Sequence, residues 1–170
     1  MYYRRKLLLG ILEEFDGVLS HTKLQKVLLL VTRKQSEKSF DFVPYKYGSF
    51  SFQANQDLST LSKKEIIIDK VKTRGSDWII NSDEAFFPTL KKEDQAAIKQ
   101  TKKEVAKFNQ QELVKYTYIK YPYFAIKSQI AEELLTDKEF EKVNAQKRSF
   151  DKPAFFHTAA SINRIVICDC

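Results

Sequence analysis

The chain has 170 residues, of which 43% are hydrophobic and 13% aromatic, and its formal net charge is +7 at pH 7. Only four glycines and four prolines are present, which argues against collagen-like and disordered classes and favours one helix-rich domain or two small ones. More of the positive excess lies in residues 1–81 than in the rest of the chain, a bias that suits phosphate binding but also serves solubility.

No segment has the features of a secretory leader or of a membrane span. The apolar stretch that follows Lys6 is short, is interrupted by Glu13 and Glu14, and is not followed by a small-residue cleavage site. No run reaches the roughly 18 apolar residues that a spanning helix needs. We therefore expect a soluble, cytoplasmic protein that has no membrane partner.

The first two predicted helices follow one another closely. Apolar residues recur at spacings of three and four over residues 4–15, which predicts a helix that ends at Asp16 and Gly17. A second helix is expected to start near Thr22, which could form a capping box with Gln25. Residues 40–48 alternate imperfectly between apolar and polar side chains, which predicts a strand or extended segment.

A third helix is predicted over residues 50–64, with Ser49 or Ser51 as its N-cap. The next segment, residues 66–80, has two runs rich in β-branched residues around a turn with a basic tip, which indicates a β-hairpin. Beyond a boundary near residue 82 we expect helices over 89–108 and 110–120 and a further one that begins within 128–135. The predicted division is 1–82, 83–156 and an atypical tail over 157–170.

The order helix, short strand, helix, helix, hairpin is typical of a winged helix-turn-helix. We therefore predict an α+β, mainly helical fold, with an N-terminal winged helix, a two-stranded wing and a C-terminal helical extension. In such folds the third helix enters the major groove of DNA and the wing touches the backbone. The candidate nucleic-acid-binding residues lie on the third helix and the wing: Asn55, Gln56, Ser59, Thr60, Lys63, Lys70, Lys72 and Arg74.

The leading functional hypothesis is therefore a non-enzymatic protein that binds double-stranded DNA. The alternative is a protein-interaction module, because exposed helix faces are generally polar and winged helices also serve as protein contacts. Phe52 interrupts the polar face of the third helix, and Tyr116 and Tyr118 lie on a later helix. These three residues are the candidates for contact with a protein partner or with a second copy of the chain.

Nothing in the sequence predicts an enzyme, a cofactor or a metal site. The glycines are scattered and form no phosphate-binding loop, and no nucleophile has a recognisable setting. His21 directly precedes a predicted helix, which favours a capping or solvent-facing role. Cys168 and Cys170 are separated by one residue and would need ligands from elsewhere to hold a metal ion.

Four segments carry a resemblance to a known family: residues 22–30, 45–53, 57–61 and 120–131. They resemble the N-terminal region of longer bacterial proteins of the DUF488 family, a domain of unknown function. The Lys-Leu-Gln-Lys and Tyr-Gly elements are also similar, more loosely, to Panacea-type antitoxin domains. The resemblance implies a bacterial, intracellular protein, supplies no catalytic mechanism, and raises either a partner-neutralising role or that of an accessory domain.

The tail departs from the pattern of the longer DUF488 proteins. In those proteins a strand and loop of the next domain follow the segment that resembles residues 152–156, whereas this chain continues from His157 with an unrelated stretch to Cys170. We expect that a frameshift or an early stop has removed the downstream domain, and the nucleotide sequence would test this. The alternative is a short family member in which residues 165–167 form an added strand.

Overall fold

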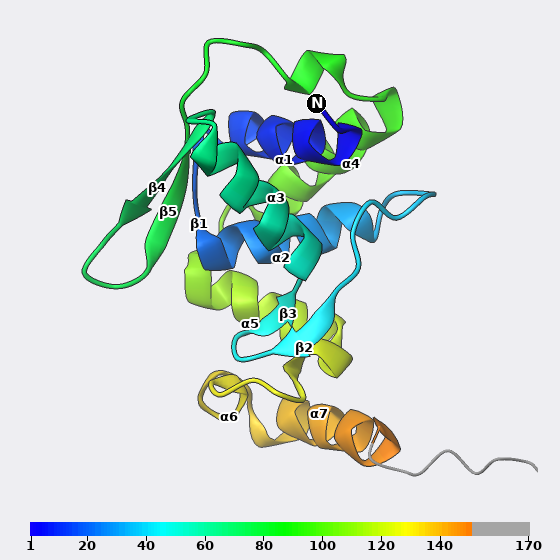
Figure 1. Cartoon of the computed structure of the whole chain (residues 1–170). Coiled ribbons are helices and arrows are strands. Elements are labelled where there is room, and N and C mark those ends of the chain that lie inside the picture. Colours follow the sequence, from blue (N-terminus) through cyan, green and yellow to red (C-terminus); the bar gives the residue numbers. More distant parts are fainter. Residues whose placement is uncertain (151–170) are drawn as a thin grey trace, which may run out of the picture.

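A computed structural model describes residues 1–150, apart from the side chain of Phe150. Its N-terminal part alternates helices with short strands (Figure 1). The elements in chain order are α1 (Tyr3–Glu14), β1 (Val18–Ser20), α2 (His21–Thr32), β2 (Val43–Tyr45), β3 (Gly48–Phe50), α3 (Phe52–Lys63), β4 (Ile67–Val71) and β5 (Ser76–Ile80).

The rest of the described chain is helical, which confirms the α+β, mainly helical class. Its elements are the 3₁₀ turn η1 (Phe87–Thr89), α4 (Lys92–Val105), α5 (Gln110–Lys120), the 3₁₀ turn η2 (Pro122–Ala125), α6 (Ala131–Leu134) and α7 (Asp137–Phe150). The helix predicted over 110–120 is present with those bounds. The one predicted over 89–108 is shorter and follows η1, whereas the segment 128–135 contains a loop before the one-turn helix α6.

The strands form two small antiparallel sheets. The predicted hairpin is present as β4 and β5, and β1 pairs with the other edge of β5, so the strand order is β1-β5-β4. The extended segment predicted over 40–48 contains β2, which pairs with β3 in a second hairpin that the sequence did not indicate. This second hairpin connects α2 to α3 in the chain and lies next to α5 (Figure 1).

Hydroxyl and amide side chains cap three of the helices. Ser20 Oγ accepts the backbone N–H of Lys23 at 3.1 Å, so α2 begins one residue before Thr22 and the predicted Thr22–Gln25 capping box is wrong. Ser51 caps α3 by accepting from Ala54 N at 3.2 Å, as one of the two predicted alternatives required. Asn109 and Glu112 form a capping box at the start of α5.

The main hydrophobic core runs across the boundary predicted near residue 82. It starts with Leu7 in α1 and includes Ile98 of α4 and Leu113 of α5. The chain after β5 is tied to α1, because the Glu13 carboxylate accepts the backbone N–H groups of Phe86 and Phe87. A second cluster, from Val114 to Val143, joins α5 to α6 and α7. The core therefore does not divide where the composition changes.

A glycine permits the close approach of the linker to α1. A Cβ atom on Gly10 would lie 2.6 Å from Leu90 Cδ1 and 3.3 Å from the Phe87 backbone. A larger residue there would push η1 and the following segment off the helix. Within residues 1–150, none of the helices combines the length and the apolar character needed to cross a membrane.

Candidate functional site

The outward face of α3 is open to solvent. Asn55, Gln56 and Lys63 are exposed, whereas Ser59 and Thr60 are half-buried. The Thr60 hydroxyl donates to the Gln56 carbonyl at 2.9 Å, which ties it to its own helix. The inner side of α3 packs against α1 and β4, while α4 and α5 pack against α2. The predicted face of α3 is therefore not covered by the later helices.

A buried carboxylate fixes the orientation of this helix. Asp57 is 2% exposed and accepts hydrogen bonds from Arg4 Nε at 2.6 Å and from Arg5 Nε at 2.8 Å. Burial by itself raises the pKa of Asp57, but the two arginine hydrogen bonds outweigh it, so the net shift is downward. This double ion pair joins α3 to α1 and holds the polar face outward.

The wing directs its lysines to a different side of the molecule. Successive residues of a strand point to opposite faces, and Asp69 pairs with Trp78 whereas Lys70 pairs with Asp77. Lys70 and Lys72 therefore share the face of Asp77, and Lys72 Nζ forms an ion pair with that carboxylate. Asn55 of α3, in contrast, lines a cavity together with Trp78. The lysines of the wing and the polar face of α3 therefore do not form the single basic surface that the sequence predicted.

The wing cations line a hollow of about 650 Å³ between the sheet and the helices α4 and α5. Lys72 and Arg74 lie on its wall together with Lys23 and Lys102. Lys102 is paired with Asp16 at 3.2 Å, so acidic groups offset part of the positive charge there. Arg74, which is exposed, makes no ion pair within the described residues.

Three aromatic rings form an exposed patch beside the N-terminus of α3. The rings of Tyr45, Phe50 and Phe52, called the aromatic patch below, have centroids 5.0–5.8 Å apart. Phe52 is 59% exposed, so its predicted surface position is present. The patch lies against the polar face of α3, which adds an apolar contact surface to it.

The two tyrosines of α5 are part of the chain's own packing. Tyr118 is 1% exposed and its hydroxyl lies 2.7 Å from Ser128 Oγ, so its assignment as a partner contact is wrong. Tyr116 is half-buried against Phe108, and its hydroxyl donates to Glu104. Both tyrosine rings pack against other residues of the chain and join α5 to its neighbours.

Glu104 is the centre of this second polar cluster. Its carboxylate pairs with Lys34, in the turn that follows α2, and with Lys120 of α5, each at 2.6 Å. Burial alone raises the pKa of Glu104, but hydrogen bonds from Lys120, Lys34 and Tyr116 bring it down to about 2. The cluster is an ion-pair network that joins α4, α5 and the turn after α2.

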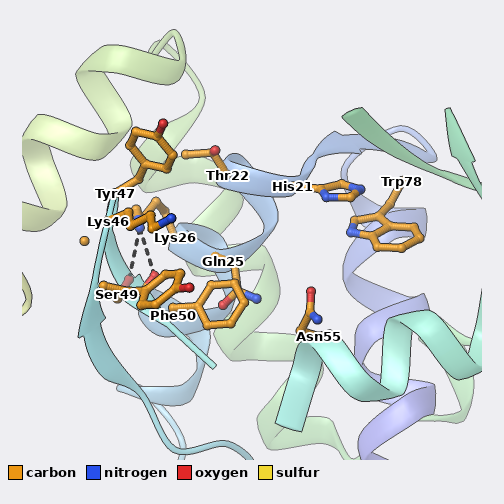
Figure 2. A pocket seen from close by; sticks show the side chains of 12 residues that line it. His21, Thr22, Gln25, Lys26, Lys46, Tyr47, Ser49, Phe50, Asn55 and Trp78 are labelled. Atoms are coloured by element: carbon orange, nitrogen blue, oxygen red, sulfur yellow. Dashed lines mark hydrogen bonds between the residues drawn. The ribbon is translucent and has the colours of Figure 1, made fainter. Parts of the chain in front are cut away.

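A cavity of about 230 Å³ lies between α2, the β2–β3 hairpin, α3 and β5 (Figure 2). Its apolar walls include Tyr45, Phe50 and Trp78. At its other end is Lys26, which is 2% exposed and whose Nζ donates to the Ser49 carbonyl at 2.9 Å. Burial lowers the pKa of Lys26 to about 7.

The backbone around Lys26 leaves no room for another side chain. Gly48 has a φ of +93°, and a Cβ there would lie 2.4 Å from the Tyr118 ring and 3.2 Å from Lys26 Nζ. Glycine adopts this left-handed conformation without strain. The Tyr-Gly element that the sequence singled out thus positions the hairpin directly over the buried lysine.

His21 lies at the end of the cavity away from Lys26, next to Trp78. Its ring stacks on Trp78 with centroids 4.3 Å apart, and Nε2 lies 2.9 Å from Asp69 Oδ1 (Figure 2 shows the two rings). Of the two roles predicted for His21, capping is wrong, since Ser20 is the cap, whereas the side chain is 38% exposed, as the solvent-facing alternative required. The ring joins α2 to the wing.

Lys26 is not among the residues predicted from the sequence, although the surrounding residues of α2 carry a signal for it. Residues 24–32 of α2 are all buried, and the four apolar residues from Leu28 to Val31 indicate a helix with no exposed face. On such a helix a lysine has no route to solvent. Its position in the second turn therefore predicts a buried cation, which is uncommon in proteins and often functional.

A comparison of the chain with protein-family models found no match, and a search among curated protein sequences found none either. The resemblance to DUF488 proteins therefore remains a prediction from the motifs. His157, Cys168 and Cys170, with the whole tail proposed over 157–170, lie outside the described residues. Across residues 1–150, no group of three or more His, Cys, Asp or Glu side chains could hold a metal ion.

Proposed function

We propose that residues 1–80 form a winged helix and that the protein binds double-stranded DNA without catalysing a reaction. The observation that carries the proposal is the exposed face of α3, with Asn55, Gln56 and Lys63 turned away from the body. Asparagine and glutamine side chains can form paired hydrogen bonds to adenine, and lysine can reach guanine or phosphate. The net charge of +7 is favourable for binding to a polyanion.

The element order also supports the proposal. The three helices, the strand β1 and the hairpin β4–β5 have the order α1-β1-α2-α3-β4-β5, interrupted only by the β2–β3 hairpin. In winged-helix proteins the third helix lies in the major groove. Exposed lysines lie near both ends of α3, with Lys46 in the β2–β3 turn and Lys63 and Lys64 at the C-terminal end.

The wing has a reduced role in this docking. Lys70 and Lys72 lie on the face of the sheet that looks away from the α3 surface, and Lys72 is engaged by Asp77. Only the tip around Arg74 extends far enough to touch a phosphate beside the groove. We therefore expect α3 and its flanking lysines to provide most of the affinity.

Fluorescence anisotropy with a labelled duplex of random sequence tests the proposal. Affinity should fall steeply between about 50 and 200 mM salt if several lysines contact phosphates. Lys63→Glu should weaken binding roughly tenfold or more, the value of one charge contact of about 1.4 kcal/mol. Arg74→Glu should have a smaller effect.

A matched control separates docking through α3 from attraction by net charge. Lys142→Glu makes the same change of charge on an exposed position of α7, remote from α3 (Figure 1). It should leave the affinity within about twofold of the wild type. An equal loss in all three variants would show that DNA is held by overall charge, and the docking through α3 would then be wrong.

The aromatic patch favours a second candidate, a protein-interaction module. Aromatic rings are enriched at protein interfaces, and Phe52 is 59% exposed although its ring contacts Tyr45 and Phe50. In the simplest case the partner is a second copy of the chain. An antitoxin-like contact with a foreign protein would use the same rings.

Sedimentation at about 1 M salt, where the Debye length is about 3 Å, tests self-association through this patch. The wild type should form a dimer and Phe52→Ser should be monomeric, because apolar contacts persist when charges are screened. Ser62→Ala, a substitution on the same helix away from the patch, is the control and should leave the dimer intact. A wild-type chain that stays monomeric at every concentration contradicts the homodimer.

A further inference from the structure

The cavity contains a buried cation without a counter-charge. Among the residues that the structure describes, no carboxylate lies within ion-pair distance of Lys26, and its only hydrogen-bond partner is Ser49. The Ser49 hydroxyl is 3.5 Å from Nζ, a weak contact beside the 2.9 Å bond to the carbonyl. An ammonium group has three donors, so at least one of them is left for another acceptor.

An ammonium in this position is costly unless something compensates it. Moving a charge out of water costs several kcal/mol, and buried charges in proteins are generally paired. A methionine could fill the same space among apolar neighbours without that cost. The presence of a lysine is therefore explained if an anion from outside the chain completes the site.

The remaining walls restrict what that anion can be. Trp78, Tyr45 and Phe50 present aromatic surface, and the volume of about 230 Å³ is below the range of drug-sized ligand pockets. The Gln25 amide is already occupied, since it accepts from and donates to the Ser51 backbone. Asn55 lines the cavity and makes no side-chain hydrogen bond within residues 1–150.

We propose that this cavity binds a small aromatic carboxylate of about one ring, with the carboxylate at Lys26 and the ring between Trp78 and the β2–β3 hairpin. The ligand carboxylate accepts from Lys26 Nζ, which then keeps its proton. The Asn55 amide is the polar group placed to bind a second substituent of the ring. The charge contact of this site is distinct from DNA binding, because it needs none of the exposed lysines, although Asn55 belongs to both surfaces.

Trp78 is the only tryptophan of the chain and lies in the cavity wall, so it reports binding directly. Titration of its fluorescence with benzoate should saturate, with a dissociation constant on the order of 1 mM or below. Benzamide, the neutral analogue, should bind at least tenfold more weakly. Acetate and inorganic phosphate, which lack a ring, should also bind at least tenfold more weakly than benzoate.

Two variants locate the anion. Lys26→Met removes the charge and keeps the length of the side chain, and it should lower benzoate affinity at least tenfold. Lys142→Met removes an exposed lysine of α7 that does not line the cavity, and it should change the affinity less than threefold. Binding of benzoate that is equal in the wild type and in Lys26→Met overturns the proposal.

The pH dependence of benzoate affinity tests the proposal with the wild-type protein alone. Since the pKa of Lys26 is about 7 in the free protein, affinity should fall by up to tenfold per pH unit above that value. The other ionisable groups around Lys26 are Tyr118 of α5, His21 of α2, Tyr45, Lys46 and Tyr47 of the hairpin, and Asp69 of β4, which is bonded to His21.

Burial raises the pKa of Tyr118 to about 12, so it stays neutral over the range tested. His21 is another residue of the cavity wall that can carry a positive charge, and a His21→Gln variant separates its contribution from that of Lys26. This variant should keep the loss of affinity at high pH if Lys26 is responsible. An affinity that does not change from about pH 6 to pH 9, or benzamide binding as tightly as benzoate, rules out the carboxylate site.

Discussion

Two buried charged side chains differ in whether the fold provides an opposite charge beside them. Asp57 is surrounded by Arg4 and Arg5, so its charge is compensated within the fold and stabilises the contact of α3 with α1. Lys26 is equally buried and has only the carbonyl and hydroxyl of Ser49. A paired buried charge is explained by structure, whereas an unpaired one points to a ligand.

The Asp57→Asn variant should be less stable than the wild type by about 2 kcal/mol, since two charge-assisted hydrogen bonds are weakened. Arg4 is partly exposed, so water screens part of this loss. The folded pKa of Asp57 is lowered, so its contribution is present at neutral pH and is lost as the pH falls below about 4. Urea unfolding at neutral and acidic pH measures this, with the exposed Asp41→Asn as control; equal stabilities would contradict the role of the pair.

Lys26 should also make stability rise with pH, but in the neutral to alkaline range, because its buried charge is unpaired and is lost as the pH rises. Its folded pKa is lowered from 10.5 to about 7, so the unfolded chain binds more protons between those values and stability rises with pH there. The wild type should therefore gain stability relative to Lys26→Met from about pH 7 to about pH 9, by up to about 1.4 kcal/mol per unit. Urea unfolding of both proteins at the two pH values gives the difference, and a constant difference would show that Lys26 is not titrating.

At the scale of the element, the exposed faces of α3 and of the wing are determined by different features of the backbone. The α3 surface results from a helix with one apolar side, and its cap at Ser51 sets where that side begins. The direction of the wing lysines results from strand pairing, because a shift of one residue in register would exchange the two faces. The sequence shows that both elements are basic, but not that they face apart.

Ser51→Ala should cost about 1 kcal/mol, the usual value of an N-cap. The loss should be accompanied by fraying of the first turn of α3, where Phe52 and Asn55 lie, since Ala54 N loses its acceptor. Thermal unfolding gives the stability, and amide exchange of residues 52–55 gives the fraying. Ser62→Ala on the same helix, whose hydroxyl makes no hydrogen bond within the described chain, should leave both unchanged.

At the scale of the whole molecule, the N-terminal part shares its core with the helices that follow. Leu90, Ile98 and Val105 come from the segment after β5, yet they pack in the same cluster as α1 and α2. The predicted boundary near residue 82 marks a change in composition. It does not mark the end of the core, because α1 and α2 each have an apolar side beyond the one that the sheet and α3 cover.

A fragment of residues 1–82 should therefore fail to unfold cooperatively. It would expose the sides of α1 and α2 that α4 and α5 cover, and small domains have little stability to spare. A fragment of residues 1–150 is the control and should show a single sharp transition. Circular dichroism during heating distinguishes them, and a cooperative transition of the shorter fragment would show that it is an independent domain.

The sequence by itself determined the first three helices, the helix over 110–120 and the β4–β5 hairpin with bounds close to those observed, because hydrophobic periodicity and turn residues are local signals. It also placed Phe52, Asn55, Gln56 and Lys63 on an exposed face, whereas Ser59 and Thr60 are half-buried. Only the tertiary structure decided that Tyr118 is internal, that the wing lysines face away from α3, and that Lys26 and Trp78 line one cavity. These depend on register and on contacts between residues far apart in the chain, and no local pattern of side chains encodes them.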